Sequence, residues 1–195
     1  METFTGHRPF VHNQQYAQDR IETIDALDLK SIDEPILDIV SAFTELPYCF
    51  PLQSCYGHFV CTADQDIYTL SPIPKICNDP IRYRIAYLAV CIEDSYVGRR
   101  LYNSLSEIQA VDPVYIQFGS ADWFWNQFPN SYVLQVEPPQ YMQKDEAILD
   151  YSEAKHVQSV RDQFFIELRN RLSDWLEKLK PHHGKSNSMV SEIKT

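Results

Sequence analysis

Apolar residues recur every three or four positions in four stretches of the chain, and this spacing predicts four helices. Their expected ranges are Gln14–Leu27, Asp33–Leu46, Ser95–Ile108 and Ser152–Leu179. Asp33 and Ser95 are N-cap residue types, Pro35 suits a first helical turn, and Pro47 and Pro181 follow the ends of two helices. The last stretch is the longest, so we expect it to bury a long apolar stripe.

Between the helices, shorter apolar runs predict strands. Gly57–Cys61 and Ile67–Leu70 flank the polar turn Asp64–Asp66 and are typical of a hairpin. Arg82–Glu93 is apolar on both alternating faces over much of its length, which is typical of a central strand covered on both sides. Two further strands are expected at Val114–Phe118 and Tyr132–Val136.

The order of these elements predicts an α+β or α/β fold, in which a single mixed or mostly antiparallel sheet packs with helices and with a long C-terminal helix. Residues 1–180 are expected to form one globular domain, since 44% of the chain is hydrophobic and can supply a continuous core. Residues 181–195 lose the apolar periodicity, which predicts a flexible tail.

The composition of the chain limits the kinds of molecule that we expect it to bind. The net charge of −10 and the pI near 5.0 make DNA an unlikely ligand, because nucleic-acid affinity depends on lysine and arginine displacing counterions. No export signal precedes the fold and no apolar run reaches bilayer length, so we expect a cytoplasmic protein without membrane contact. The five cysteines are an odd number and lie mostly in apolar segments, which predicts reduced thiols.

The chemically suggestive stretch is Pro47–Cys61, where a helix ends and an apolar strand begins. Ser54, Cys55, Gly57 and His58 gather at the expected strand entry, a position from which α/β folds often present side chains to a ligand. They are our first candidate ligand-binding residues. Two readings remain beside this one: a buried structural cysteine, which is the more common case, and a Cys55 thiol nucleophile with His58 as its base.

A zinc site is a further alternative for the same stretch, because thiolates and imidazole are the usual zinc ligands. The residues concerned would be Cys49, Cys55, His58 and Cys61. Their spacing lacks a Cys-x-x-Cys knuckle, and His58 and Cys61 would point to opposite faces of a strand. From the sequence we therefore predict no metal site.

Aromatic residues are densest between positions 123 and 128. Trp123 and Trp125 stand there beside two phenylalanines, with Asp122 and Asn126 interleaved. Such rings usually belong to a core, but when exposed they stack on a base or line an apolar pocket. Trp123 and Trp125 complete our set of candidate ligand-binding residues.

The run Ile32–Phe43, followed by Tyr48 and by Ser54–Phe59, resembles the start of the wybutosine-synthesis (tRNA) methyltransferase family. In that family a helix leads to a Ser-Cys-x-Gly-Arg signature on a strand. Ser54, Cys55 and Gly57 match the signature, and His58 stands in place of its arginine. Tyr83–Val90 and the helix after it resemble the family's continuation, so that about half the chain is covered.

The resemblance implies an α/β fold, S-adenosylmethionine as cofactor and a modified tRNA base as substrate. The residues by themselves assign no reaction. Two other classes therefore stay open: a small-molecule-binding domain without catalysis, and an interaction module that meets a protein partner through an aromatic or acidic surface. The sequence gives no indication of the oligomeric state.

Overall fold

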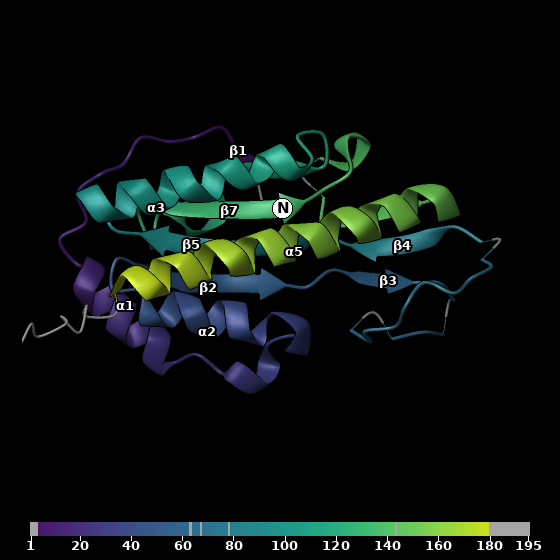
Figure 1. Cartoon of the computed structure of the whole chain (residues 1–195), viewed down its shortest axis with the longest axis horizontal. Coiled ribbons are helices and arrows are strands. Elements are labelled where there is room, and N and C mark those ends of the chain that lie inside the picture. Colours follow the sequence, from purple (N-terminus) through teal and green to yellow (C-terminus); the bar gives the residue numbers. More distant parts are fainter. Residues whose placement is uncertain (1–3, 63, 67, 78, 143, 180–195) are drawn as a thin grey trace, which may run out of the picture.

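A computed structural model describes residues 4–62, 64–66, 68–77, 79–142 and 144–179. Figure 1 shows its elements in chain order. The helices are α1 (Tyr16–Asp25), α2 (Leu37–Glu45), α3 (Tyr96–Ser106), α4 (Asp122–Trp125) and α5 (Tyr151–Leu179). The strands are β1 (Phe4–Thr5), β2 (Cys49–Cys55), β3 (His58–Val60), β4 (Ile81–Arg84), β5 (Ala86–Ile92), β6 (Ile116–Ala121), β7 (Ser131–Val136) and β8 (Glu146–Leu149). No helix in the described ranges is long and apolar enough to cross a bilayer.

The strands form two antiparallel sheets, one of five strands in the order β1-β6-β7-β5-β2 and one of three in the order β3-β4-β8. The α+β class and the long C-terminal helix are thus confirmed, whereas the expected single sheet is divided into two. The chain passes between the sheets from β7 to β8 and at two short crossings, from β2 to β3 through Tyr56 and Gly57, and from β4 to β5 through Ile85. These two crossings lie side by side (Figure 1).

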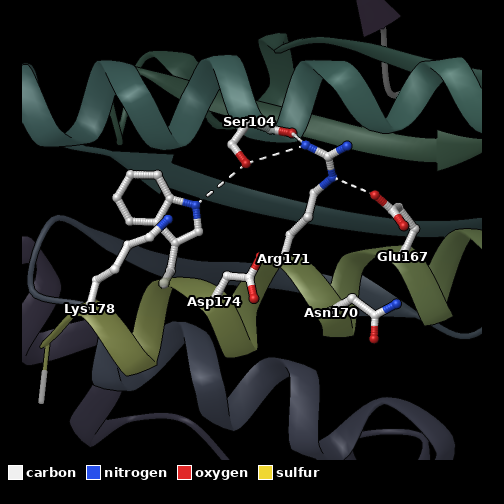
Figure 2. A pocket seen from close by; sticks show the side chains of 7 residues that line it. Ser104, Glu167, Asn170, Arg171, Asp174 and Lys178 are labelled. Carbon is white, nitrogen blue, oxygen red and sulfur yellow. Dashed lines mark hydrogen bonds and ion pairs between the residues drawn. The ribbon is translucent and has the colours of Figure 1, made fainter.

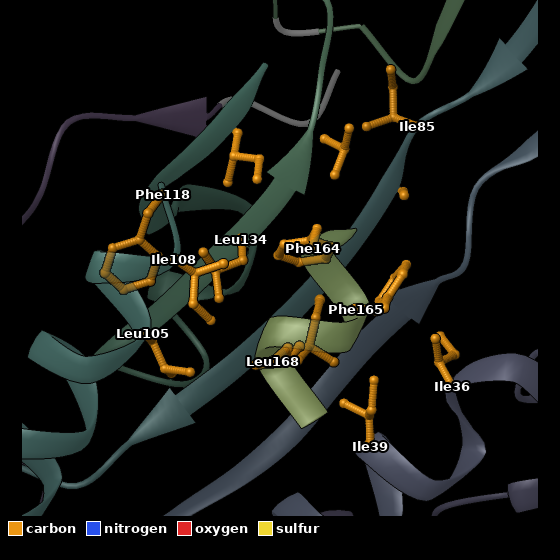
Figure 3. Close-up of a cluster of buried hydrophobic side chains, with 14 of the residues drawn as sticks. Ile36, Ile39, Ile85, Leu105, Ile108, Phe118, Leu134, Phe164, Phe165 and Leu168 are labelled. Carbon is orange, nitrogen blue, oxygen red and sulfur yellow. The ribbon is translucent and has the colours of Figure 1, made fainter. Parts of the chain in front are cut away.

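Helix α5 lies along both sheets and joins them (Figure 1). Its buried stripe keeps the predicted helical spacing. The residues of the predicted stripe that are buried are Val157, Val160, Phe164, Leu168, Leu172 and Trp175, and Ala154 and Phe165 are buried beside them. Figure 3 shows Phe164, Phe165 and Leu168 pointing into the main core between α2, α3 and the large sheet. The last predicted member of the stripe, Leu179, is exposed.

The long strand predicted at Arg82–Glu93 is two strands, because the chain leaves one sheet for the other at Ile85. The Ile85 amide donates to the backbone oxygen of Asp145 outside either sheet ladder. Sequence pattern could not show this break, since Tyr83, Ile85 and Tyr87 continue the same alternation across it. Only the partners of each half differ.

The predicted hairpin is wrong. Among the described residues of 62–80 there is no strand, and β3 pairs with β4 instead. The Asp66 side chain accepts from the Tyr68 amide, and the Asp66 backbone oxygen accepts from the Thr69 amide. These local bonds hold a turn where a strand was expected.

Strand β2 was missed because it contains Pro51, which cannot donate to a sheet ladder. β2 is an edge strand, and its register against β5 shifts between Pro51 and Gln53. A proline is tolerated at such an edge bulge. β2 ends at Cys55 and β3 begins at His58, so the Ser54–His58 stretch joins the end of one strand to the expected start of the next.

The face of the large sheet opposite α5 carries two smaller apolar clusters. Tyr16 of α1 covers Phe50 and Cys91, and next to them lie Ala89, Ala121 and Val133 beneath larger side chains.

The helices predicted at 14–27, 33–46 and 95–108 are confirmed, with ends that differ by a few residues. Ser95 Oγ accepts from the Gly98 amide as an N-cap. The tail predicted at 181–195 lies outside the described residues.

Candidate functional site

The site forms where β2 passes into β3, in the segment Cys55–His58, which we call the junction loop. Gly57 has φ +90°, a conformation that side chains with a Cβ rarely adopt. A Cβ built on Gly57 would lie 2.7 Å from Ala86 Cβ on the neighbouring crossing. The two crossings can therefore approach this closely only with glycine at position 57.

Asp33 holds the junction loop from outside. Its Oδ2 accepts from the Tyr56 amide at 2.8 Å and lies 3.1 Å from His58 Nε2. Asp33 was expected to cap the helix that follows it, but its side chain makes no cap hydrogen bond there. The carboxylate instead connects the segment ahead of α2 to the junction loop across 23 and 25 residues of sequence.

Burial and pairing act in opposite directions on the two ionisable groups. Burial alone would lower the pKa of His58, but the hydrogen bond with Asp33 and the nearby Cys55 side chain outweigh it and raise the pKa to about 9. Burial alone would raise the pKa of Asp33, but the His58 ring and the Tyr56 amide outweigh it and lower the pKa. At neutral pH the pair is an imidazolium and a carboxylate.

We expect this pair to make stability depend on pH. In the unfolded chain His58 has a pKa near 6.5, so its contribution is complete below pH 6.5 and is lost as pH rises to about 9. The free energy of unfolding should fall by about 2 kcal/mol over this range, allowing for the partial exposure of Asp33. Urea unfolding at several pH values in EDTA, with His58→Gln as the control, measures it. Equal slopes in both proteins would contradict the assignment.

Arg161 of α5 closes the junction loop from the other side. Its side chain is 7% exposed and donates from Nη1 to the Gly57 backbone oxygen at 2.8 Å. The guanidinium also lies over the Tyr56 ring, 4.1 Å from the centroid, and pairs with Asp162. The loop backbone is therefore fixed by two charged side chains, one from each flanking helical segment.

The structure brings Cys55 and His58 together, and both are buried, at 4% and 2% exposure. Asp33, Cys55 and His58 each offer one ligand-type atom, and these atoms lie within 4.8 Å of one another. His58 Nδ1 is buried and has no hydrogen-bond partner in the described part of the chain. We call these three residues the junction cluster.

The four residues considered for zinc from the sequence do not gather. Cys49 lies at the opposite end of β2 from Cys55. Cys61 lies beside Cys77. Burial, and to a smaller extent the neighbouring Cys77 thiol, raise the pKa of the Cys61 thiol. Asp33 takes their place beside Cys55 and His58, a partner that no motif in the sequence indicated.

A partly exposed rim surrounds the junction cluster. The Asp33 side chain is 22% exposed, and Arg84, the register partner of His58, is near enough to lower the pKa of Asp33 further. The Arg84 guanidinium lies 4.8 Å from the centroid of the exposed Tyr68 ring. Tyr87 lies opposite Cys55 in the β2–β5 ladder. Burial lowers the pKa of Arg84, but the hydrogen bond with Tyr68 and nearby groups that include Tyr87 outweigh it and raise that pKa. The rim thus offers a carboxylate, a cation and an aromatic ring to solvent.

The other candidate residues are placed separately. Ser54 is half-buried and pairs with Leu88. Trp123 packs on the same small apolar cluster as Tyr87, so it shares the sheet face opposite α5, and its buried Nε1 has no partner among the described residues. Trp125 packs against Tyr132 and carries Arg8 over its ring. The structure therefore associates Trp123, but not Trp125, with the side of the sheet that carries Tyr87.

A hollow lies between α3 and α5, away from the junction cluster. Figure 2 shows Arg171 reaching toward Ser104 across it. Arg171 donates to Ser104 and also pairs with Glu107 and Glu167, while Trp175 Nε1 donates to Ser104 Oγ at 3.4 Å. These bonds fasten α5 to α3, which is a structural role.

Comparison with models of known protein families finds no match, and comparison with curated proteins finds none either. Among solved structures, the PH1069 protein from Pyrococcus horikoshii matches at a TM-score of 0.44 and 13% identity, covering 85% of this chain and 94% of that one. A structure of PH1069 from Pyrococcus horikoshii OT3 matches at a TM-score of 0.47 and 12% identity, covering 88% and 98%. Similarity at this level supports no conclusion about what the present chain does.

Proposed function

We propose that the protein binds S-adenosylmethionine, or a nucleotide close to it, at the rim of the junction loop. The ligand class comes from the resemblance of Ser54, Cys55 and Gly57 to the wybutosine-synthesis methyltransferase signature. The observation that carries the site is the grouping of Asp33, Arg84 and an exposed tyrosine ring around that loop. The proposed site lies at the rim, since Cys55 and His58 are buried.

The side chains of the rim are complementary to the chemical groups of S-adenosylmethionine. S-adenosylmethionine carries an adenine ring, ribose hydroxyls, an ammonium and a carboxylate. The ionised Asp33 is an acceptor for the ammonium or the hydroxyls, and Arg84 is a donor for the carboxylate. Tyr68 offers its ring to the adenine face. His58 holds Asp33 in place from beneath and acts as a positioning residue.

Binding and catalysis are separate parts of the proposal. From the resemblance we further propose that the protein is a cytoplasmic methyltransferase that acts on a modified tRNA base. With a net charge of −10, the chain would have to hold a nucleic acid through local contacts rather than through a broad basic surface. Binding of the cofactor is therefore the first property to test, ahead of any substrate.

The test is calorimetry with S-adenosylmethionine, S-adenosylhomocysteine and adenosine monophosphate on EDTA-treated protein. We expect Arg84→Gln to weaken binding of the amino-acid-bearing ligands at least tenfold, since a charged hydrogen bond contributes about 1.5–3 kcal/mol. Arg99→Gln is the matched control, because Arg99 also lies 4.8 Å from an aromatic centroid, over Phe10, but on α3. No heat with any ligand, or equal losses in both variants, would refute the site.

A further inference from the structure

The junction cluster of Asp33, Cys55 and His58 contains the three side-chain types that bind zinc most often: a carboxylate, a thiolate and an imidazole. They come from three places in the chain, ahead of α2, at the end of β2 and at the start of β3. In the described ranges this is the group of three such residues whose ligand atoms lie within 4.8 Å of one another. We propose that it is a binding site for a divalent transition-metal ion, with Zn²⁺ as the preferred ion.

The spacing is close to that of a tetrahedral site. With zinc–ligand bonds of about 2.0–2.3 Å, neighbouring ligand atoms are about 3.3–3.6 Å apart. Asp33 Oδ2 and His58 Nε2 are already 3.1 Å apart. With all three ligand atoms inside 4.8 Å, the site closes on an ion through a movement of about 1 Å, within the range of a side-chain adjustment.

The ring of His58 gives an independent reason. Its side chain is 2% exposed, and Nδ1 has no hydrogen-bond partner in the described part of the chain. Buried polar atoms are rarely left in this state, because the protein loses the hydrogen bond that water would have made. Once the imidazolium loses a proton, one ring nitrogen has a lone pair available for an ion, and among the described residues no hydrogen bond occupies Nδ1.

Charge and surroundings also suit a divalent ion. The Asp33 carboxylate and a Cys55 thiolate together carry two negative charges, which one Zn²⁺ neutralises. The proton held between His58 and Asp33 and the thiol proton are released when the ion binds. Three protein ligands leave a fourth position for water or for a group of a bound molecule, as in catalytic zinc sites. The inference stands whether or not a nucleotide binds at the rim.

The test uses the full chain, stripped with EDTA and titrated with Zn²⁺ by calorimetry and with Co²⁺ by absorption spectroscopy. We expect one Zn²⁺ per chain, and a thiolate-to-Co²⁺ charge-transfer band. Cys55→Ser should abolish the band and weaken Zn²⁺ binding at least tenfold, and Asp33→Asn should weaken binding in the same direction. Cys91→Ser is the control, since this buried thiol lies on the same sheet away from the cluster, and should change neither reading.

A measurement on the unaltered protein keeps the test valid if a variant fails to fold. Zn²⁺ should slow the alkylation of Cys55 by iodoacetamide, followed by peptide mass spectrometry, and leave the rate at Cys61 unchanged. Protection of Cys61 and Cys77 instead, binding unaffected by Cys55→Ser, or no binding at all would overturn the site. Because the nucleotide experiment is done in EDTA, failure of one proposal is distinguishable from failure of the other.

Discussion

Gly57→Ala should destabilise the protein by about 2–6 kcal/mol, because it adds a methyl group at a positive φ and in a space that neighbouring atoms already fill. Holding alanine at φ +90° costs about 1–3 kcal/mol, and forcing a methyl group into an occupied space costs about 1–3 kcal/mol more. The occupied space is that of Ala86 Cβ at 2.7 Å and Tyr83 Cε2 at 3.1 Å. Chemical denaturation followed by circular dichroism measures the loss.

Two further variants separate these causes. Gly6→Ala is the matched control, because nothing lies within 4 Å of a Cβ at Gly6, and it should change stability little. Ala86→Gly removes the closest obstructing atom, so it should cost less in the Gly57→Ala background than in the wild type. Strictly additive losses in the double variant would show that the two crossings do not press on each other at this point.

Leu168→Ala should lower the free energy of unfolding by about 2–5 kcal/mol. Leu168 is fully buried in the main core, where Figure 3 shows it beside Phe164 and Phe165 on α5. The truncation removes apolar contacts and leaves a cavity between α5 and the large sheet. Ile166→Ala on the exposed side of α5 is the control and should cost less than 1 kcal/mol. Equal effects of both would place α5 at the periphery of the fold.

Helices were predictable from this sequence because the signals that mark a helix, its apolar periodicity and its capping residues, lie within a short stretch of the chain. The periodicity of α5 and the cap at Ser95 need no knowledge of distant residues. Strand partners were not predictable, because the division at Ile85 depends on which strand lies opposite each half. Pro51 concealed β2 for a related reason: its tolerance depends on the strand lying at a sheet edge.

Only part of the candidate site was predictable from the sequence. Ser54, Cys55, Gly57 and His58 stand out as neighbours in sequence, and the positive φ of Gly57 fits a turn at that point. Asp33 looked like a helix cap, since aspartate before a proline-containing first turn usually is one. Its carboxylate belongs to the junction loop because of long-range packing, which no local pattern encodes.

Arg161 was hidden in the same way, inside the apolar stripe of α5. Its spacing places it on the buried face, next to Val160 and ahead of Phe164. An arginine at such a position signals a buried polar partner, here the Gly57 backbone oxygen, but the sequence does not say which one. The anchor of the loop could be found only from the fold.

The central claim is that the rim of the junction loop is a ligand-binding site. Nuclear magnetic resonance of ¹⁵N-labelled protein, titrated with S-adenosylhomocysteine, tests it most directly. We expect the largest shifts at the backbone amides of Tyr56, Gly57 and Arg84, with little change in α3. Shifts centred on the hollow of Figure 2, around Ser104 and Arg171, or no shifts at all, would contradict the account.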